Sequence, residues 1–383
     1  MMIKKVLVVG GTWDLDGGKE SGFIRKFYSE LAMYLDDITY LNGGNYNSLI
    51  NVLNTVGDYD VVFWFPNVDN ALEKVRHVKK INPYTLLVGS KRNDGKYSFV
   101  DVLNKTLLER HNLSIEFTKE NDNFKMLLFD PLGTKWYEGD NIHDLVEHLY
   151  KRLYFLSTTK REHTHQVPGN VDIPNNLEYF SYVRDAAEIF HQTIDHSDGV
   201  TKFMGNASFR GDKYIYVSKR DVDKSKIDIN NFVASYLDNG TLYYHGDSKP
   251  SKDTIVQANL YNLFSNINYM IHSHCYLVDG SFTEMPVPCG SLDEIDEIKK
   301  VIERDYDGNY DLPLYKINYL GHGCLLLGNS IELLKTVSFK SRVFPEELPN
   351  TEELLDKGME EKSIIKLSLS WVLSFSSMIW YFF

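Results

Sequence analysis

The sequence predicts an α/β protein built from two domains of different organisation. With 383 residues, the chain is longer than a single hydrophobic core usually requires. Residues 1–157 alternate short apolar runs with amphipathic stretches, which is typical of strands alternating with helices. Residues 158–176 are polar, lack periodicity and contain two prolines, so we expect a linker there. A second α/β domain is expected over 177–345, followed by a C-terminal tail over 346–383.

The sequence of residues 1–157 predicts a doubly wound, Rossmann-like sheet. Its apolar runs are too short for helices, and several end in Gly, Pro or Asn: KVLVVGG, YDVVFWFPN, TLLVGS and KMLLFDP. Helical patterns lie between them, such as FIRKFYSELAMYL and ALEKVRHVKK. A last helical pattern keeps one apolar stripe, formed by Ile142, Leu145, Val146, Leu149 and Leu153. Strands that alternate with helices in this way form a mostly parallel sheet.

The loop after the first strand, GGTWDLDGGKESG, is rich in glycine. Ligands of such sheets bind at the carboxyl ends of the strands, where backbone amides can hold a phosphate. We therefore hypothesise that Gly10, Gly11 and Thr12 contact a nucleotide. The loop contains neither a G-x-G-x-x-G fingerprint nor a P-loop, because Gly18-Lys19 is followed by Glu20. The alternative is that the glycines only turn the chain.

Composition narrows the possible partners. The formal charge of −12 argues against a nucleic-acid partner, which would require basic patches. A small anionic substrate remains compatible with this charge, because a basic pocket can lie inside an acidic protein. The three cysteines lack C-x-x-C spacing, which argues against a disulfide framework and favours the reducing cytoplasm.

The two ends of the chain bear on membrane attachment. The first residues, MMIKKVLVVGG, contain too short an apolar run for a secretory signal. Residues 367–383 carry no charge over 17 residues, fewer than the roughly 20 that span a bilayer. We expect this tail to dock in a subunit interface or a core, and a membrane tail is the alternative.

The stretch NINYMIHSHC contains two histidines that a strand would direct to one face, because side chains at positions i and i+2 point the same way. His272 and His274 form this pair, and His322 follows another strand candidate, LYKINYLG. Three histidines with an open fourth position are typical of catalytic zinc, a Lewis acid that can stabilise an enediolate. The alternative is a turn at His322 beside a buried, hydrogen-bonded pair. A second H-x-H pair, His163 and His165, lies in the polar linker, where we expect no metal.

An ordered set of motifs suggests a family for the second half: LEYFSYVRDAAEIFHQTI, GNASFR, VDKS, PSKD, HSH and GHG. In this order they resemble the class II aldolase/adducin family over about 177–337. The resemblance implies an α/β/α fold, a Zn²⁺ cofactor and a homo-oligomer, usually a tetramer. It also implies a lyase that performs aldol cleavage or condensation on a small phosphorylated or anionic sugar. Epimerisation, dehydration, a non-catalytic adducin-like scaffold, or nucleotide processing by the first half are the alternatives.

The resemblance also implies roles for particular residues. Asp253, 19 residues before His272, takes the place of the family's usual glutamate as the group that moves a proton. Its alternative role is a helix N-cap. Residues expected to bind the anionic group of the substrate are Asn206, Ser208, Ser218, Lys219, Arg220, Ser251 and Lys252.

The anion-binding loop departs from the family pattern. The family's usual loop resembles T-P-S-G before VDKS, whereas this chain has Ser218-Lys219-Arg220-Asp221. We expect the loss of Pro and Gly to change the backbone, and the added Lys and Arg to supply charge-assisted donors. A solvated basic turn is the competing interpretation. The segment after His274, CYLVDGSFTEM, is shorter than in the family, so substrate specificity does not carry over.

Overall fold

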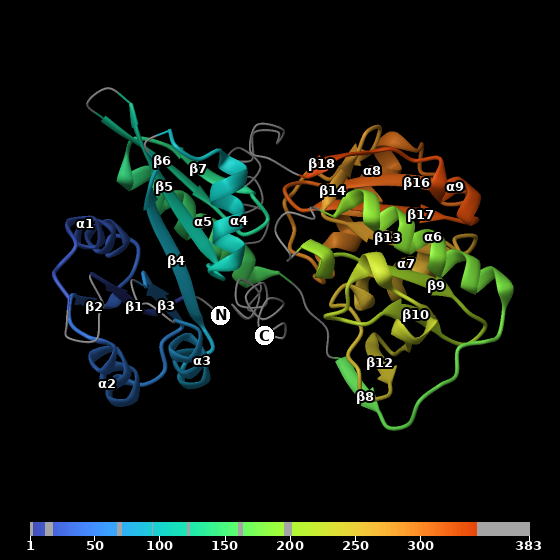
Figure 1. The fold of residues 1–383 in the computed structure, drawn as a ribbon, viewed down its shortest axis with the longest axis horizontal. Coiled ribbons are helices and arrows are strands. Elements are labelled where there is room, and N and C mark those ends of the chain that lie inside the picture. Colours follow the sequence, from blue (N-terminus) through green and yellow to red (C-terminus); the bar gives the residue numbers. More distant parts are fainter. Residues whose placement is uncertain are drawn as a thin grey trace. The chain divides into compact units, whose positions relative to one another are not determined.

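A computed structural model describes residues 3–11, 18–66, 71–93, 95–120, 123–159, 164–194 and 201–342. Thr12, His163 and the tail expected over 346–383 lie outside these residues. The described chain divides between Thr158 and Thr159 into two compact units, which we call the N-terminal unit and the C-terminal unit (Figure 1). Among the described residues, no helix is both long enough and apolar enough to cross a bilayer.

The N-terminal unit is built on a seven-stranded sheet in the order β2-β1-β3-β4-β5-β6-β7. Its strands are β1 (Lys5–Gly10), β2 (Asp37–Asn42), β3 (Val61–Trp64), β4 (Thr85–Arg92), β5 (Leu113–Glu120), β6 (Asn123–Phe129) and β7 (Lys135–Gly139). Strands β1 to β5 pair in parallel, and β6 and β7 add antiparallel pairs. The order 2-1-3-4-5 is a doubly wound arrangement, which confirms the predicted fold class.

Helices follow the parallel strands: α1 (Gly22–Leu31), α2 (Tyr46–Val56), α3 (Ala71–Ile81), α4 (Phe99–Leu108) and, after β7, α5 (Ile142–Thr158). Side-chain caps mark the starts of several of them, and the Ser98 cap of α4 forms a full capping box with Asp101. Successive side chains along β1 and β3 point to opposite faces of the sheet, and different helices cover the two faces. Val9 packs with the residues of α2 and α3, whereas Phe63 contacts Phe27 of α1.

The two described glycines of the first loop allow close packing. A Cβ on Gly10 would lie 2.5 Å from Ile24 of α1. A Cβ on Gly11, whose φ is +103°, would lie 2.5 Å from the backbone nitrogen of Gly43. Both glycines therefore let neighbouring segments approach the end of β1 closely. Nucleotide contact by this loop remains a hypothesis.

In the described part of the C-terminal unit, the main sheet has the order β15-β16-β17-β13-β9-β10-β11-β12-β8. These strands are β8 (Thr164–Val167), β9 (Asn206–Arg210), β10 (Ile215–Ser218), β11 (Phe232–Asp238), β12 (Thr241–His245), β13 (Tyr269–Ser273), β15 (Ser281–Phe282), β16 (Leu314–Tyr319) and β17 (Gly323–Gly328). Most neighbours are antiparallel. A separate pair joins β14 (Cys275–Leu277) to β18 (Phe339–Arg342).

Helices cover both faces of this sheet, as an α/β/α arrangement requires (Figure 1). Helices α6 (Leu177–Thr193) and α9 (Ile331–Lys335) pack on one face, and α7 (Thr254–Leu263) and α8 (Asp293–Asp305) on the other. On β13, Tyr269 and Ile271 belong to the α6 core, whereas Met270 belongs to the α7 and α8 core. Because side chains alternate along a strand, His272 shares the face of Met270.

The stretch expected to be a plain linker contributes an edge strand. Strand β8 pairs in parallel with β12, and the ring of His165 stacks on Tyr243 with their centroids 5.6 Å apart. An edge strand is held by backbone hydrogen bonds on one side only, so it needs no apolar periodicity. The polar composition of 158–176 therefore predicted a linker where the structure has the short strand β8.

Candidate metal centre

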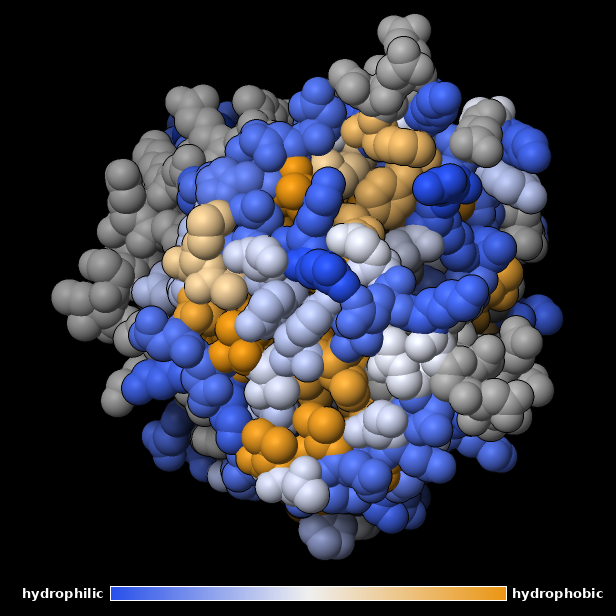
Figure 2. Space-filling view, turned by 90° about the vertical axis from the view of Figure 1, so that its left-hand side faces the viewer, coloured by the Kyte–Doolittle hydropathy of each residue, from blue (hydrophilic) through white to orange (hydrophobic). Residues whose placement is uncertain are grey.

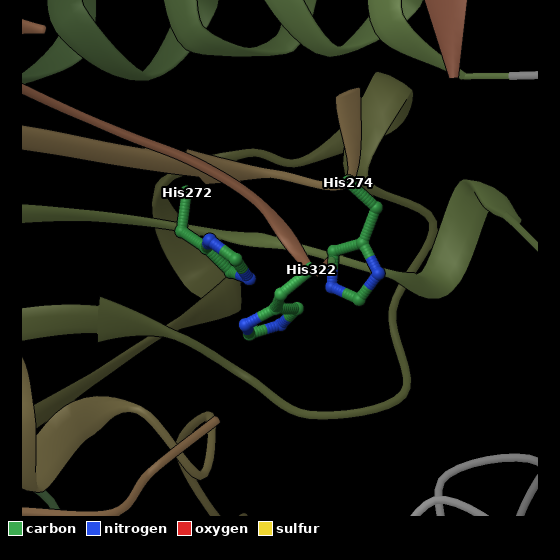
Figure 3. A group of neighbouring side chains, drawn as sticks. All are labelled: His272, His274 and His322. Atoms are coloured by element: carbon green, nitrogen blue, oxygen red, sulfur yellow. The ribbon is translucent and has the colours of Figure 1, made fainter. Parts of the chain in front are cut away.

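Three histidines converge on the α7 face of the sheet. His272 is the fourth residue of β13, and His322 lies in the turn between β16 and β17. His274 does not belong to the same strand as His272, because β13 ends at Ser273 and β14 begins at Cys275. The break turns the backbone at His274, yet its ring still joins the other two (Figure 3).

The three rings are close enough to share one ion. One ligand nitrogen from each lies within 4.8 Å of the others. The ring centroids are 5.0 Å apart for His272 and His274, 4.8 Å for His272 and His322, and 5.0 Å for His274 and His322. His272 and His322 are buried, and His274 is half-buried.

The protonation of the rings suits a metal. Nδ1 of His272 donates to the carbonyl oxygen of Cys324 at 2.8 Å, which leaves Nε2 as the ring nitrogen that can face a metal. That Nε2 and both ring nitrogens of His322 are buried and have no hydrogen-bond partner in the described chain. Burial, and then the neighbouring His272, hold the pKa of His322 well below its usual value, so its imidazole is neutral. Buried polar atoms without partners are costly, and a metal ion would satisfy them.

Asp253 lies beside this cluster. It stands at the N-cap position of α7 but makes no capping hydrogen bond. Its Oδ2 lies 3.9 Å from Nε2 of His272 and accepts hydrogen bonds from Asn206 Nδ2 at 2.6 Å and Ser251 Oγ at 3.3 Å. The carboxylate is therefore directed into the cluster and not towards the helix backbone, unlike the N-cap role that was its alternative.

Comparison with known proteins assigns a family to this region. Residues 184–280 match the model of the class II aldolase and adducin N-terminal domain. All of the matched residues belong to the C-terminal unit. The match confirms the resemblance predicted from the motifs, and it spans Asn206, Asp253, His272 and His274. His322 lies beyond the matched range.

Solved structures similar to this chain include L-fuculose-1-phosphate aldolase from Thermus thermophilus, at 14% identity and a TM-score of 0.30, covering 49% of this chain and 93% of the other. YgbL from Klebsiella pneumoniae also matches at 14% identity and a TM-score of 0.30, over 49% of this chain and 90% of the other. A further L-fuculose 1-phosphate aldolase matches at 15% identity and a TM-score of 0.30, over 48% and 97%. No curated protein sequence matches significantly.

In the C-terminal unit, Asn206 of β9 links the carboxylate of Asp253 to the sheet. It pairs with His272 across β9 and β13 and is fully buried. Its Nδ2 donates to Ser251 and Asp253, and its Oδ1 accepts from Gln257 of α7. Gln257 follows Asp253 by four residues, one helical turn, so sequence spacing could have identified it.

The two loops expected to bind an anion are joined by backbone contacts. Ser251 N donates to Ser218 O at 3.2 Å, and Arg220 N donates to Lys249 O at 2.9 Å. Lys219 and Pro250 pair as an isolated antiparallel β-bridge. The basic residues on both loops are therefore held in one region, next to Ser251.

The altered loop keeps a backbone that glycine usually adopts. Asp221, which stands where the family has Gly, has a φ of +64°. This left-handed conformation favours glycine, so a non-glycine residue is strained there. Lys224 of the VDKS motif fastens the loop, because its Nζ donates to the carbonyl oxygens of Lys219 and Val222 at 3.2 and 3.0 Å.

Two of the predicted anion-binding serines are engaged elsewhere. Ser208 Oγ hydrogen-bonds the hydroxyl of Tyr261 on α7 at 3.0 Å. Ser218 Oγ accepts the backbone N–H of Ala207 at 3.1 Å. Both serines are fully buried and hold β9 to its neighbours. The Nε of Arg220, by contrast, is buried and has no partner in the described chain.

Sequence reasoning missed a second layer of groups around Asp253. Cys289 Sγ donates to Asp253 Oδ1 at 2.6 Å. Burial, and then the charge of Asp253, raise the pKa of Glu294 well above its usual range, so Glu294 is held in its neutral form. Burial, and then the charge of Glu294, raise the pKa of Tyr319 well above its usual range, and its ring stacks on His322 with their centroids 5.6 Å apart. In the sequence, PVPCGS contains Cys289 and LYKINYLG contains Tyr319, but neither stretch marks these residues as neighbours of Asp253.

Proposed function

We propose that the C-terminal unit is a zinc-dependent lyase of class II aldolase type that acts on a small phosphorylated or otherwise anionic sugar. The convergence of His272, His274 and His322 beside Asp253 is the observation that carries this proposal. The match of residues 184–280 to the class II aldolase and adducin N-terminal domain supports it.

The donor set favours zinc. Neutral imidazoles suit Zn²⁺, and three protein ligands leave a fourth position open, as catalytic zinc sites do. When bound, the ion would supply a Lewis acid that polarises a carbonyl or hydroxyl oxygen of the substrate. His272 would present Nε2, since its Nδ1 is committed to the carbonyl of Cys324.

Asp253 would move the proton of the reaction. In the cleavage direction, its carboxylate takes the proton of a substrate hydroxyl while the carbon–carbon bond breaks to give an aldehyde. The electron pair of that bond stays on the second fragment, beside its carbonyl, and Asp253 returns the proton to this carbon. Donors from Asn206, Ser251 and Cys289 hold the carboxylate in place during both transfers.

The basic loops would bind the anionic group. Arg220 offers a buried Nε without a partner in the described residues, and Lys252 adds a second cation on the adjoining loop. Guanidinium and ammonium groups form strong hydrogen bonds with phosphate and carboxylate oxygens. We extend the proposal to a homo-oligomer, for which a light-scattering mass well above 44.3 kDa is the test.

The metal is tested first. Protein purified without added metal is analysed for metal content as wild type, His272→Ala and His322→Ala, with His165→Ala of the edge strand as the matched control. We expect about one zinc ion per chain in the wild type and control, and loss in both site variants. A well-folded wild type without metal would overturn the proposal.

Activity is tested next, on a panel of ketose 1-phosphates, with release of an aldehyde and a ketose fragment as the readout. Cleavage supports the lyase. Conversion without cleavage would identify an epimerase or dehydratase, which use the same proton transfer. Bound zinc with no turnover on the panel would favour a scaffold, and turnover that survives loss of the metal would favour chemistry in the N-terminal unit.

A further inference from the structure

The N-terminal unit contains a cavity of about 770 Å³, within the range of small-molecule sites. It lies at the end of β4, between the start of α1, the β5–β6 pair and the start of α5. In a doubly wound sheet, ligands usually bind where the strand order reverses, which here is between β1 and β3. Gly10 and Gly11 do not line the cavity. The last two residues of the glycine-rich loop, Ser21 and Gly22, do line it.

The wall of this cavity is cationic although the protein as a whole is acidic. Lys26, Lys91 and Arg92 line it, against one carboxylate, Asp140. Lys91 is paired with Glu109. Lys26 and Arg92 are exposed, and neither forms an ion pair with a residue that the structure describes. Two cations thus remain available to an anionic ligand in a chain of net charge −12.

The same cavity offers flat apolar surface. Phe23 and Phe117 meet edge to face, with their centroids 4.9 Å apart and their planes at 86°. The guanidinium of Arg92 lies over the ring of Phe124, 5.3 Å from its centroid. Figure 2, which faces this unit, shows hydrophobic side chains lying among hydrophilic ones. Aromatic rings beside a stacked guanidinium suit a planar ring, because such rings stack or meet edge to face.

We propose that this cavity binds a small ligand that joins a planar heteroaromatic ring to an anionic group, of the chemical class of nucleoside monophosphates. Lys26 and Arg92 take the anion, and Phe23, Phe117 and Phe124 take the ring. The site is independent of the metal centre, because every residue that lines it belongs to the N-terminal unit.

Calorimetric titration of the full chain tests the proposal, with AMP, GMP, UMP and flavin mononucleotide as probes. Adenosine and ribose 5-phosphate separate the ring from the phosphate. We expect at least one probe to bind with a Kd below about 1 mM, and to bind about tenfold more tightly than either half alone. Lys26→Ala and Arg92→Ala should each weaken that probe by about tenfold. Binding should protect residues 21–27, 90–92 and 117–126 from hydrogen exchange.

Two control variants exclude a non-specific effect of charge and binding of the probe at the C-terminal unit. Lys80→Ala removes a lysine from α3 that does not line the cavity, and should leave affinity unchanged. His322→Ala should also leave it unchanged. The proposal is overturned if no probe binds, if both cavity variants bind like the wild type, or if binding requires His322. Both cavity substitutions fall on exposed side chains, so thermal unfolding should show that they fold normally.

Discussion

At the scale of single residues, Asp253 combines a helix-start position with a role outside the helix. Its carboxylate accepts from Asn206, Ser251 and Cys289 and makes no capping hydrogen bond to the first N–H groups of α7. A carboxylate held by three side-chain donors is positioned more narrowly than a solvated one. Such positioning is what proton transfer to a bound substrate requires.

Asp253→Asn should separate proton transfer from metal binding. The amide cannot accept a proton, so we expect turnover to fall by about 10²- to 10⁴-fold on the substrate that the wild type cleaves. Metal content should stay at the wild-type value, because the metal-ligand candidates are histidines. Asp223→Asn, which alters hydrogen bonds to Ser225 and an ion pair with Lys226, is the control. Equal turnover in both variants, or loss of metal from Asp253→Asn alone, would contradict the assignment.

His111 gives the N-terminal unit a predictable response to acid. Burial lowers its pKa to about 4, from 6.5 in the unfolded chain. Between these values the unfolded chain binds more protons, so the free energy of unfolding falls as pH drops from about 6.5 to about 4. The total loss is about 3 kcal/mol. Below pH 4 this group adds no further loss.

Urea unfolding followed by tryptophan fluorescence measures this response. Trp64 and Trp136 are buried in the N-terminal unit, and residues 159–342 contain no tryptophan. His111→Gln cannot titrate and should lose less stability across this pH window than the wild type. His143→Gln, a partly exposed histidine paired with Glu30, should keep the wild-type slope. An unchanged slope in His111→Gln would show that other groups carry the acid response.

At the scale of elements, the metal centre depends on how closely one hairpin approaches one strand. A Cβ on Gly323 would lie 2.2 Å from the carbonyl oxygen of Ser273 and 2.8 Å from Cα of His274. Both are backbone atoms, so no side chain can move aside. The turn that carries His322 therefore reaches the other histidines only because glycine follows it.

Gly323→Ala should push the β16–β17 turn away from β13 and abolish metal binding, with a loss of stability above the roughly 1 kcal/mol of backbone strain alone. Gly240→Ala is the matched control, since Gly240 also has a positive φ, +81°, but open space around its Cβ. Metal content and urea midpoints of both variants decide the matter. Full metal occupancy in Gly323→Ala would refute the close-approach argument.

The elements also show what sequence reasoning can reach. Periodicity predicted the parallel sheet, and the i, i+2 spacing of His272 and His274 predicted that the two rings lie on one side, because side-chain direction in a strand follows from the order of residues. It did not predict Cys289 or Glu294, which reach Asp253 from a segment at least 36 residues away along the chain. Such convergence depends on tertiary packing, which leaves no local period. The break at His274 and the left-handed Asp221 were missed for a related reason, since neighbouring strands impose them.

At the scale of the whole molecule, the two units have separate cores, and the three-histidine centre belongs to the C-terminal unit. A ligand that binds only the folded state stabilises it by RT ln(1 + [L]/Kd), about 4 kcal/mol at a thousandfold excess over Kd. Metal removal should therefore act on the C-terminal unit and leave the N-terminal unit as stable as before.

Calorimetry of the full chain with and without EDTA measures this difference. We expect two thermal transitions, of which only one moves to lower temperature when the metal is removed. The fluorescence of Trp64 and Trp136, which are buried in the N-terminal unit, should follow the transition that does not move. His322→Ala should melt like the EDTA-treated wild type and show no further response to EDTA. A single transition that moves as a whole would mean that the two units unfold together, so that metal binding stabilises the entire chain.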